Sequence, residues 1–143
     1  MTADTGRWRI RRAAWDDPTD RERLRLIRRE VFIVEQQVPE ALEWDEDDAS
    51  AIHLLAETSD GGPVGTARIL PSGQIGRMAV RKSWREQGVG KALLQAAIEH
   101  CSRPPFLHAQ VYAIPFYATA GFSPVGEVFL EAGILHRVMR LSV

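Results

Sequence analysis

The sequence predicts an α/β (α+β) domain built on a mixed, mostly antiparallel central sheet that is flanked by helices. Three observations lead to this prediction. Short segments rich in apolar residues are joined by tight Gly- and Pro-containing turns in the middle of the chain, as in consecutive antiparallel strands. A longer segment with an apolar period near 3.6 then predicts a helix. The whole element order is β-α-β-β-β-α-β-α-β-β.

The bulk composition is that of an ordinary globular protein. We expect a single domain over residues 1–143, because 143 residues fit one domain, and 45% hydrophobic and 26% charged residues are usual values. The formal net charge of −1 argues against a general attraction to nucleic acid or to anionic lipid. Cys101 is the single cysteine, which excludes an internal disulfide framework and a Cys-based metal cluster.

The chain shows no targeting or membrane signal. No run approaches the ~18 consecutive apolar residues that a membrane span requires. The N-terminal residues have no apolar stretch behind them that could serve as a signal peptide. We therefore expect a cytoplasmic protein that uses neither membrane nor nucleic acid as a partner. A homodimer is compatible with the sequence, which does not locate an interface.

The first third of the chain predicts a strand, a helix and a loop. Residues 8–14 mix apolar and basic side chains and predict the first strand. Thr19, followed by Glu22 at the capping-box spacing, predicts a helix start. One face of that helix is apolar, with Leu24, Ile27 and Val31. Pro39 stops any continuation, and residues 40–48 are acidic without an apolar period, which predicts a surface loop.

The middle of the chain predicts three antiparallel strands. They span residues 51–57, 64–70 and 74–80. The connections are Ser59-Asp60-Gly61-Gly62 and Pro71-Ser72-Gly73, both of them turns short enough to join adjacent strands.

The remaining elements follow a change of period after the third of these strands. Residues 88–102 predict a helix whose apolar stripe contains Leu94, Ala97, Ile98 and Cys101, so that Cys101 is read as a buried structural thiol. Residues 106–113 predict a strand and 114–120 a short helical segment. A closing hairpin has strands 125–131 and 134–141.

The segment Arg85-Glu86-Gln87-Gly88-Val89-Gly90-Lys91 predicts an anion site. It lies between a strand and a helix, where glycines let the backbone approach a ligand closely. The N–H groups at a helix start have no partners within the helix and suit a diphosphate, and Lys91 adds a full charge. The spacing is neither a dinucleotide fingerprint nor a Walker loop. A merely flexible turn is the alternative for an isolated pair of glycines.

Two motifs resemble those of the GNAT superfamily of acyl-CoA-dependent N-acyltransferases. Arg85-x-x-Gly88-x-Gly90 matches the signature [Gln/Arg]-x-x-Gly-x-[Gly/Ala]. The aromatic pair Phe116-Tyr117, followed by Gly121-Phe122, resembles the second signature. Residues 31–36, Gly76-Arg77 and 131–136 are similar to an ElaA-type branch, although Leu135 stands where that branch commonly has proline, and Gln110 where many members have asparagine.

The resemblance implies a site for acetyl-CoA and no metal. The cofactor would lie in a cleft where the strands 74–80 and 106–113 splay apart. The backbones of Met78 and Val80 would pair with its pantetheine arm, and the amides of residues 87–91 would hold its diphosphate. The cofactor-binding residues expected on this basis are Met78, Ala79, Val80, Arg85, Glu86, Gln87, Gly88, Val89, Gly90, Lys91, Gln110 and Phe116.

The implied reaction is acetyl transfer to a primary amine of a small molecule, peptide or protein, by direct attack in a ternary complex. An alkyl amine with a pKa near ~10.4 must first lose a proton, and the departing thiolate leaves more easily if it gains one. Tyr117 is the expected proton donor, because the family's catalytic tyrosine occupies this place. A partly buried structural aromatic is the alternative.

The base that takes the amine proton is not fixed by the sequence. The family's glutamate on the strand before residues 85–91, which we call the phosphate loop, is missing from residues 74–80. The candidates for the base are Glu35, His53, Glu131 and His136, each of which could instead be structural. Of these we expect Glu35 and His53 to be catalytic, and Arg77, Glu131 and His136 to contact the substrate. His100 and His108 are read as structural or surface residues.

Two further questions stay open at this level. The carboxylates of residues 45–48 are either a solvated loop or an attractant for a cationic amine. The chain as a whole is either an enzyme or a non-catalytic acyl-CoA-binding regulatory module, and a nucleotide-binding scaffold is a third class. Acetyl-CoA turnover with an amine separates the first two.

Overall fold

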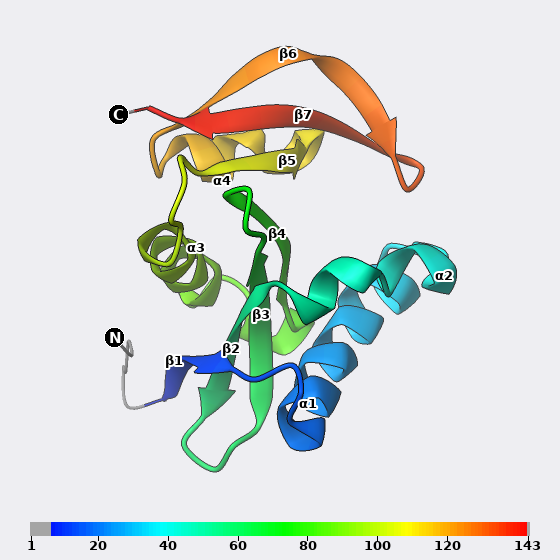
Figure 1. The fold of residues 1–143 in the computed structure, drawn as a ribbon, viewed down its shortest axis with the longest axis vertical. Helices are drawn as coiled ribbons and strands as arrows, with labels where there is room; N and C mark the ends of the chain where they lie inside the picture. The colour runs from blue at the N-terminus through cyan, green and yellow to red at the C-terminus, as the bar shows by residue number, and fades with distance from the viewer. Residues whose placement is uncertain (1–6, 143) are drawn as a thin grey trace.

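The computed structural model describes residues 7–142. Its seven-stranded sheet has the order β1-β2-β3-β4-β5-β7-β6 (Figure 1). The strands are β1 (Trp8–Ala13), β2 (Ile52–Thr58), β3 (Pro63–Ile69), β4 (Gln74–Val80), β5 (Phe106–Gln110), β6 (Phe122–Glu131) and β7 (Ile134–Leu141). Among the strands of residues 7–142, only β4 and β5 are parallel, which confirms a mixed, mostly antiparallel sheet.

Helical segments connect the strands. The longer ones are α1 (Pro18–Arg28), the π-helix η1 (Arg29–Glu35) that continues it, and α3 (Val89–Glu99). The short ones are α2 (Glu40–Glu43), η2 (Glu46–Ala49), η3 (Lys82–Trp84), η4 (Val111–Ala113) and α4 (Ile114–Ala118). In Figure 1, α1 and α3 lie on opposite sides of the β1–β4 part of the sheet.

The core has two layers because successive strand residues point to opposite faces of the sheet. Leu54 of β2 packs in the cluster that contains Leu93 and Leu94 of α3. Its neighbour Leu55 packs in the cluster that contains Leu24 and Ile27 of α1. All these side chains are almost fully buried, so each helix covers one face with its apolar stripe.

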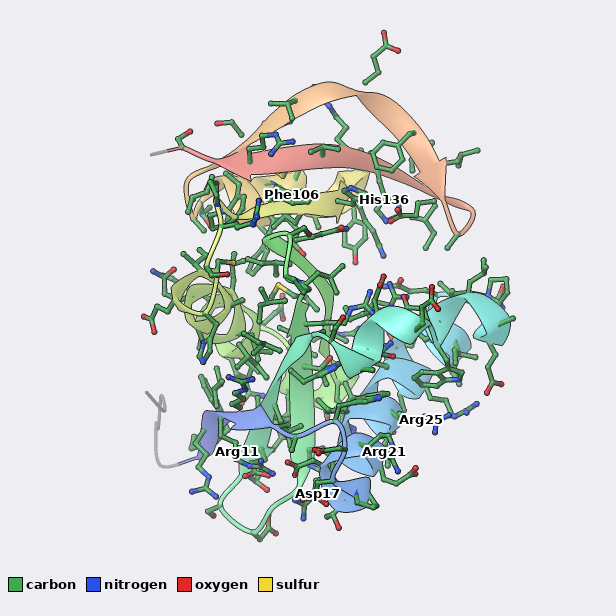
Figure 2. All side chains as sticks on the ribbon, viewed as in Figure 1. Arg11, Asp17, Arg21, Arg25, Phe106 and His136 are labelled. Carbon is green, nitrogen blue, oxygen red and sulfur yellow. The ribbon has the colours of Figure 1, made fainter. Side chains whose placement is uncertain are left out.

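The start of α1 differs from the prediction. Asp17, labelled in Figure 2, is the N-cap. Its Oδ1 accepts a hydrogen bond from the Thr19 backbone N–H at 2.9 Å. Pro18 occupies the first turn, where its fixed φ and missing N–H are favourable. Thr19 therefore lies inside the helix, and the capping box with Glu22 is wrong.

The acidic segment 40–48 is largely exposed, as its composition predicts, but it is neither an irregular loop nor solvated throughout. It folds into α2 and η2, and it buries the side chains of Glu43 and Asp48, each 2% exposed. Burial of two carboxylates is tolerated only because arginines from distant parts of the chain pair with them. Those partners cannot be read from the segment itself.

The sheet opens between its two parallel strands. β4 and β5 pair only at Gln74 with Phe106 and at Ile75 with Leu107. On its other edge β4 changes register with β3, so that Arg77 and Met78 oppose a single β3 residue and form a β-bulge. Arg77 has a φ of +47°, and its carbonyl accepts a hydrogen bond from Thr66 Oγ1 at 2.9 Å. β5 ends at Gln110, three residues before the predicted end, where η4 turns the chain away.

Candidate active site

A cavity of about 480 Å³ lies where β4 and β5 separate. Its walls come from the end of η1, the acidic segment, β3, β4, β5, α4 and the β6–β7 hairpin. Six of the residues that the sequence singled out line it together: Arg77, Met78, Gln110, Tyr117, Glu131 and His136. The phosphate loop, Glu35 and His53 are not part of this lining.

The phosphate loop has the backbone conformation of an anion-binding site. We call its uncapped N–H groups at the start of α3 the anion cradle. Gly88 is the N-cap of α3, with a φ of +87°, and no side chain caps this helix. The N–H groups of the first helical turn, at Val89, Gly90 and Lys91, consequently have no helical partner and no cap. A Cβ placed on Gly88 would meet no atom within 4 Å, so its backbone conformation, not the available space, calls for glycine. Lys91 is exposed beside these donors.

Phe116 lies against the start of α3. A Cβ on Gly90 would stand 3.5 Å from Phe116 Cζ, an ordinary contact distance. The Phe116 ring is 38% exposed and meets the Tyr117 ring edge to face, with centroids 5.1 Å apart. The aromatic pair therefore connects the anion cradle to the cavity, with one ring at each.

Arg85 fixes the other end of the loop. Its Nε donates to the Val80 carbonyl at 2.9 Å, and its Nη2 donates to Glu35 Oε1 at 2.8 Å. Glu35 is thus paired with a guanidinium, exposed, and placed outside the cavity lining. Gln87 Nε2 donates to the Ser83 carbonyl at 3.2 Å. The side chains of the loop bind their own surroundings and leave the helix amides open.

His53 is a buried core residue. Its Nε2 lies 2.9 Å from the Asp48 carbonyl oxygen, and its ring stacks on Trp15 with centroids 4.7 Å apart. Burial lowers the pKa of His53. With 2% exposure and no place in the cavity lining, this imidazole is not brought to the other candidates.

A network of three arginines and three carboxylates, which we call the arginine network, lies at one wall of the cavity, and four of its members line it. Its members are Arg28, Arg68, Arg77, Glu43, Asp45 and Asp48. Arg28 is buried and donates to Glu43 Oε2 and Asp48 Oδ1, both at 2.8 Å. Arg68 Nη1 donates to Asp45 at 2.7 Å and to Asp48 at 3.0 Å. The network joins α1, the acidic segment, β3 and β4.

Arg77 carries this network to the cavity. Its Nη2 donates to the Glu43 carbonyl at 3.1 Å and to Asp45 Oδ2 at 3.2 Å. Since most acidic groups of the segment are already paired with arginine, they do not act as a free anionic surface. Asp47, also in the lining, is exposed.

The opposite wall holds two histidines on either side of one glutamate. His108 Nδ1 lies 3.0 Å from Glu131 Oε1, and His136 Nε2 lies 3.8 Å from Glu131 Oε2. His136 Nδ1 is 2.7 Å from the Ile134 carbonyl oxygen. Figure 2 shows His136 below β7, on the side that faces the rest of the molecule.

His108 is the site residue that sequence reasoning missed. The register pairs Gln110 with His136, which puts His108, Gln110 and His136 on one face of adjacent strands. Because side chains alternate between the two faces of a strand, the sequence alone places His108 and Gln110 on the same face of β5. The pairing of β5 with β7 is needed to bring that face to Glu131, and no local pattern reveals it.

Tyr117 lines the same cavity. Burial, with a smaller contribution from the charge of Tyr112, raises the pKa of Tyr117 to about 12. The phenol therefore keeps its proton at neutral pH. Gln110 is engaged differently from the expectation of a cofactor contact, because its Nε2 donates to Gln36 Oε1 of the η1 end at 2.9 Å.

Within residues 7–142, no group of three or more His, Cys, Asp or Glu side chains has an arrangement that could hold a metal ion. In the same part of the chain, no helix is long and apolar enough to cross a membrane.

A sheet that opens between two parallel strands, with an uncapped, glycine-containing helix start nearby, defines an acetyltransferase-type fold. The chain belongs to the family described as "Acetyltransferase (GNAT) domain", which matches residues 15–143. This membership confirms the family that the two motifs indicated.

The relatives extend over most of the chain. Protein ElaA of Escherichia coli (strain K12) is 35% identical, covering 82% of this chain and 84% of ElaA. Its crystal structure superposes with a TM-score of 0.82, at 32% identity, over 94% of this chain and 99% of that one. The uncharacterized N-acetyltransferase YjcF of Bacillus subtilis (strain 168) is 38% identical over 79% of this chain and 86% of YjcF.

A solved structure titled as an acyl-CoA N-acyltransferase, from Pseudomonas aeruginosa, is also similar. It superposes with a TM-score of 0.81, at 30% identity, over 99% of this chain and 100% of that one. The likeness to ElaA agrees with the narrower resemblance of residues 31–36, Gly76-Arg77 and 131–136.

Proposed function

We propose that the protein transfers an acetyl group from acetyl-CoA to a primary amine of a small molecule or peptide, by direct attack in a ternary complex. The observation that carries the proposal is the position of Tyr117. It is a phenol held in its protonated form, in a cavity at the point where β4 and β5 separate. A proton donor in this position is what a departing thiolate requires.

The open edge of β4 fits the pantetheine arm. From Gly76 to Val80 this edge has no partner on β5, so its backbone can pair with an extended ligand as with an added strand. Four residue steps at a rise of roughly 3.3 Å span about 13 Å along this edge. An arm that enters beside the anion cradle and follows Val80 and Met78 reaches the cavity.

The anion cradle fits the diphosphate of CoA. The amides of residues 87–91 include the unpaired donors at the start of α3, where the helix dipole favours negative charge. Lys91 adds a positive charge from the first turn, and Phe116 offers an exposed aromatic face next to Gly90. No loop side chain closes over these donors.

The chemistry needs two proton carriers and no metal. The amine loses a proton, its lone pair attacks the thioester carbon, and the C–S bond breaks. Tyr117 gives its phenolic proton to the departing sulfur. Arg77, Glu131 and His136 line the cavity in which the acceptor would lie.

The similar proteins support transfer to an amine. One of the relatives is named an N-acetyltransferase and one solved structure is titled an N-acyltransferase. The proposal also keeps a cytoplasmic location and an amine, not a nucleic acid or a membrane, as the partner. It does not depend on whether the protein forms a homodimer.

The test mixes the purified protein with acetyl-CoA and a panel of primary amines, and it follows both free thiol and acetylated product. Thiol release that depends on protein and amine, with matching product by mass spectrometry, is the expected result. Binding of CoA by calorimetry without any thiol release would instead favour the regulatory module. Failure to bind CoA at millimolar concentration contradicts both functions.

A further inference from the structure

We propose that His108 is the catalytic base that takes the amine proton, and that Glu131 is the residue that positions it. The inference rests on the proposed acetyl transfer. It assigns the general base, a role for which the two sequence motifs supply no residue. It starts from the position of His108 in the sheet. β4 and β5 last pair at Ile75 with Leu107, so His108 is the first residue of β5 beyond the junction.

This position is where the two substrates would meet. A ligand that follows the β4 edge from Val80 toward Gly76 is directed to the junction of the strands, and His108 lies across from it. His108 and Tyr117 line the same cavity. The residue that takes a proton from the amine and the residue that gives one to the sulfur are thus on one cavity surface.

The contact with Glu131 fixes the tautomer of His108. A carboxylate accepts hydrogen bonds, so the nitrogen 3.0 Å from Glu131 Oε1, Nδ1, carries the proton. In the neutral ring, Nε2 then holds the lone pair, as in other carboxylate-oriented histidine bases. No described residue makes a hydrogen bond to His108 Nε2.

Two aromatic rings hold the imidazole in place. Phe129 meets it edge-on, with centroids 5.2 Å apart and an interplanar angle of 84°. Phe106 lies on its own strand, with centroids 6.4 Å apart. A ring fixed by a carboxylate and by neighbouring aromatic rings has little rotational freedom left to lose on catalysis.

The other candidates are placed less well for this role. His136 is 7% exposed, and its Nδ1 donates to the Ile134 carbonyl. Its Nε2 is 3.8 Å from Glu131, beyond hydrogen-bond distance, so Glu131 does not orient it as it orients His108. Glu35 is paired with Arg85, and His53 is buried outside the cavity lining.

The proton balance is complete without another reactant. The ammonium form of the acceptor gives one proton to His108 Nε2, which passes it to solvent. The amine lone pair forms the C–N bond, the C–S bond breaks, and Tyr117 protonates the sulfur. The second proton of the acylated nitrogen returns to the Tyr117 oxygen. The net products are the amide, free CoA thiol and one proton.

His108→Asn tests the base directly. The Asn amide retains a donor near the position of Nδ1, but nothing replaces the Nε2 lone pair. We expect kcat/KM at neutral pH to fall about 100-fold, within the range for loss of a general base, while CoA affinity stays within about twofold. The defect should shrink as the pH rises toward the pKa of the amine, because free amine no longer needs the base.

The matched control is His100→Asn. His100 lies at the end of α3, its Nδ1 contacts the Ala96 carbonyl at 2.8 Å, and it is not part of the cavity lining. This variant should keep the wild-type rate. If His108→Asn does not fold, His108→Gln serves the same comparison, since its amide reaches the Nε2 position without being basic.

Glu131→Gln tests the positioning role through the split between kcat and KM. A neutral amide accepts the Nδ1–H less strongly than a carboxylate and can also turn its NH2 group toward the ring, so the ring is no longer held in one tautomer. We expect kcat to fall about tenfold while KM for acetyl-CoA stays within about twofold, and the same change should cost little more in the His108→Asn background, because the two residues act as a unit. The other charged or titratable groups around the cavity are His136 from β7, Tyr117 from α4, Tyr112 from η4, Arg77 from β4, Arg68 from β3, and Glu43, Asp45 and Asp47 from the acidic segment.

The outcomes separate the roles of His108 and Glu131 from the proposed acetyl transfer itself. A His108→Asn protein with a wild-type rate across the pH range overturns the base assignment and leaves the acetyltransferase intact. A Glu131→Gln protein with the wild-type kcat, or one whose loss adds in full to that of His108→Asn, overturns the positioning role. Wild-type protein that binds CoA and releases no thiol with any amine contradicts the proposed transfer itself, and the base with it.

Discussion

The arginine network and the phosphate loop organise charge in opposite ways. In the network, Arg28, Glu43 and Asp48 are buried, and each is satisfied by partners from other elements. In the loop, residues 85–88 are exposed and the helix amides behind them have no cap. A wall must keep its shape, and the buried charges of Arg28, Glu43 and Asp48 are accordingly all paired. A binding surface must have donors to offer, so its interactions are left open.

The difference has energetic consequences. Removing one partner from a buried ion pair leaves an unpaired charge, which is strongly destabilising. An exposed pair is screened by water and contributes little. Changes in the network should therefore alter folding, and changes in the loop should alter ligand binding with little effect on folding.

Arg28→Met should show the largest effect. It leaves two buried carboxylates, Glu43 and Asp48, without their main partner, and we expect a loss of about 3–5 kcal/mol in the free energy of unfolding. Urea denaturation measures it. Arg29→Met, the next position along the chain, removes an exposed pair with Glu40 and a guanidinium contact over the Trp44 ring, and it should change the unfolding midpoint far less than Arg28→Met. Equal urea midpoints for Arg28→Met and Arg29→Met would contradict the claim that the buried network contributes more to stability than an exposed ion pair does.

Tyr117→Phe should come next, and it acts on rate alone. We expect kcat to fall about 100-fold with CoA affinity little changed, since only the proton donor is lost. Because the pKa of Tyr117 is raised to about 12, the wild-type rate should show no decline from ionisation of this phenol between about pH 8 and pH 10.

The control is Tyr112→Phe, which removes the other phenol, on a side chain that is 76% exposed. It should retain most of the turnover. If Tyr112→Phe is the variant that loses turnover and Tyr117→Phe is not, the assignment of the proton donor is reversed.

Gly88→Ala should weaken CoA binding with a smaller effect on folding. The residue has a φ of +87°, and an alanine there costs about 1 kcal/mol or relaxes the turn, which displaces the amide donors. We expect CoA affinity to fall roughly tenfold, equivalent to about 1.4 kcal/mol. Isothermal titration calorimetry measures it.

Gly126→Ala is the matched control for backbone strain. Gly126 lies in β6 with a φ of +75° and, like Gly88, has open space where a Cβ would stand. It should show a similar change in stability and normal CoA affinity. Equal CoA affinities for Gly88→Ala and Gly126→Ala would contradict the assignment of the diphosphate site to the start of α3.

Glu35→Gln should show the smallest effect. Its exposed pair with Arg85 contributes at most about 1 kcal/mol to stability, and the side chain lies outside the cavity lining. We expect kcat/KM within about threefold of wild type in the amine assay. A drop of 100-fold would restore Glu35 as a base and would weaken the case for His108.

The sequence alone predicts the parts of the molecule that depend on neighbours along the chain. Turns at 59–62 and 71–73 fix the antiparallel β2–β3–β4 unit, and the glycines at 88 and 90 mark the anion cradle. The splay of β4 from β5 follows from the resemblance, not from local pattern. Its confirmation comes from the two-pair register.

What the sequence misses depends on contacts between distant residues. The acidic segment looks solvated because its partners, Arg28 and Arg68, lie on α1 and β3. His108 looks structural because its partner Glu131 is brought near only when β7 pairs with both β5 and β6. In each case the residue type is known from the sequence, but the partners that surround the side chain come from other elements and are known only from the fold.

The two-pair junction of β4 and β5 also has a mechanical consequence. Backbone continuity between the β1–β4 and β5–β7–β6 portions of the sheet passes through two residue pairs, Gln74–Phe106 and Ile75–Leu107. Beyond them, the portions are joined by side-chain bridges such as the Gln36–Gln110 amide pair. A ligand that hydrogen-bonds along the open edge of β4 would replace the backbone hydrogen bonds that β5 does not make there. The same molecule would then be a reactant and would also stiffen the junction between the two portions of the sheet.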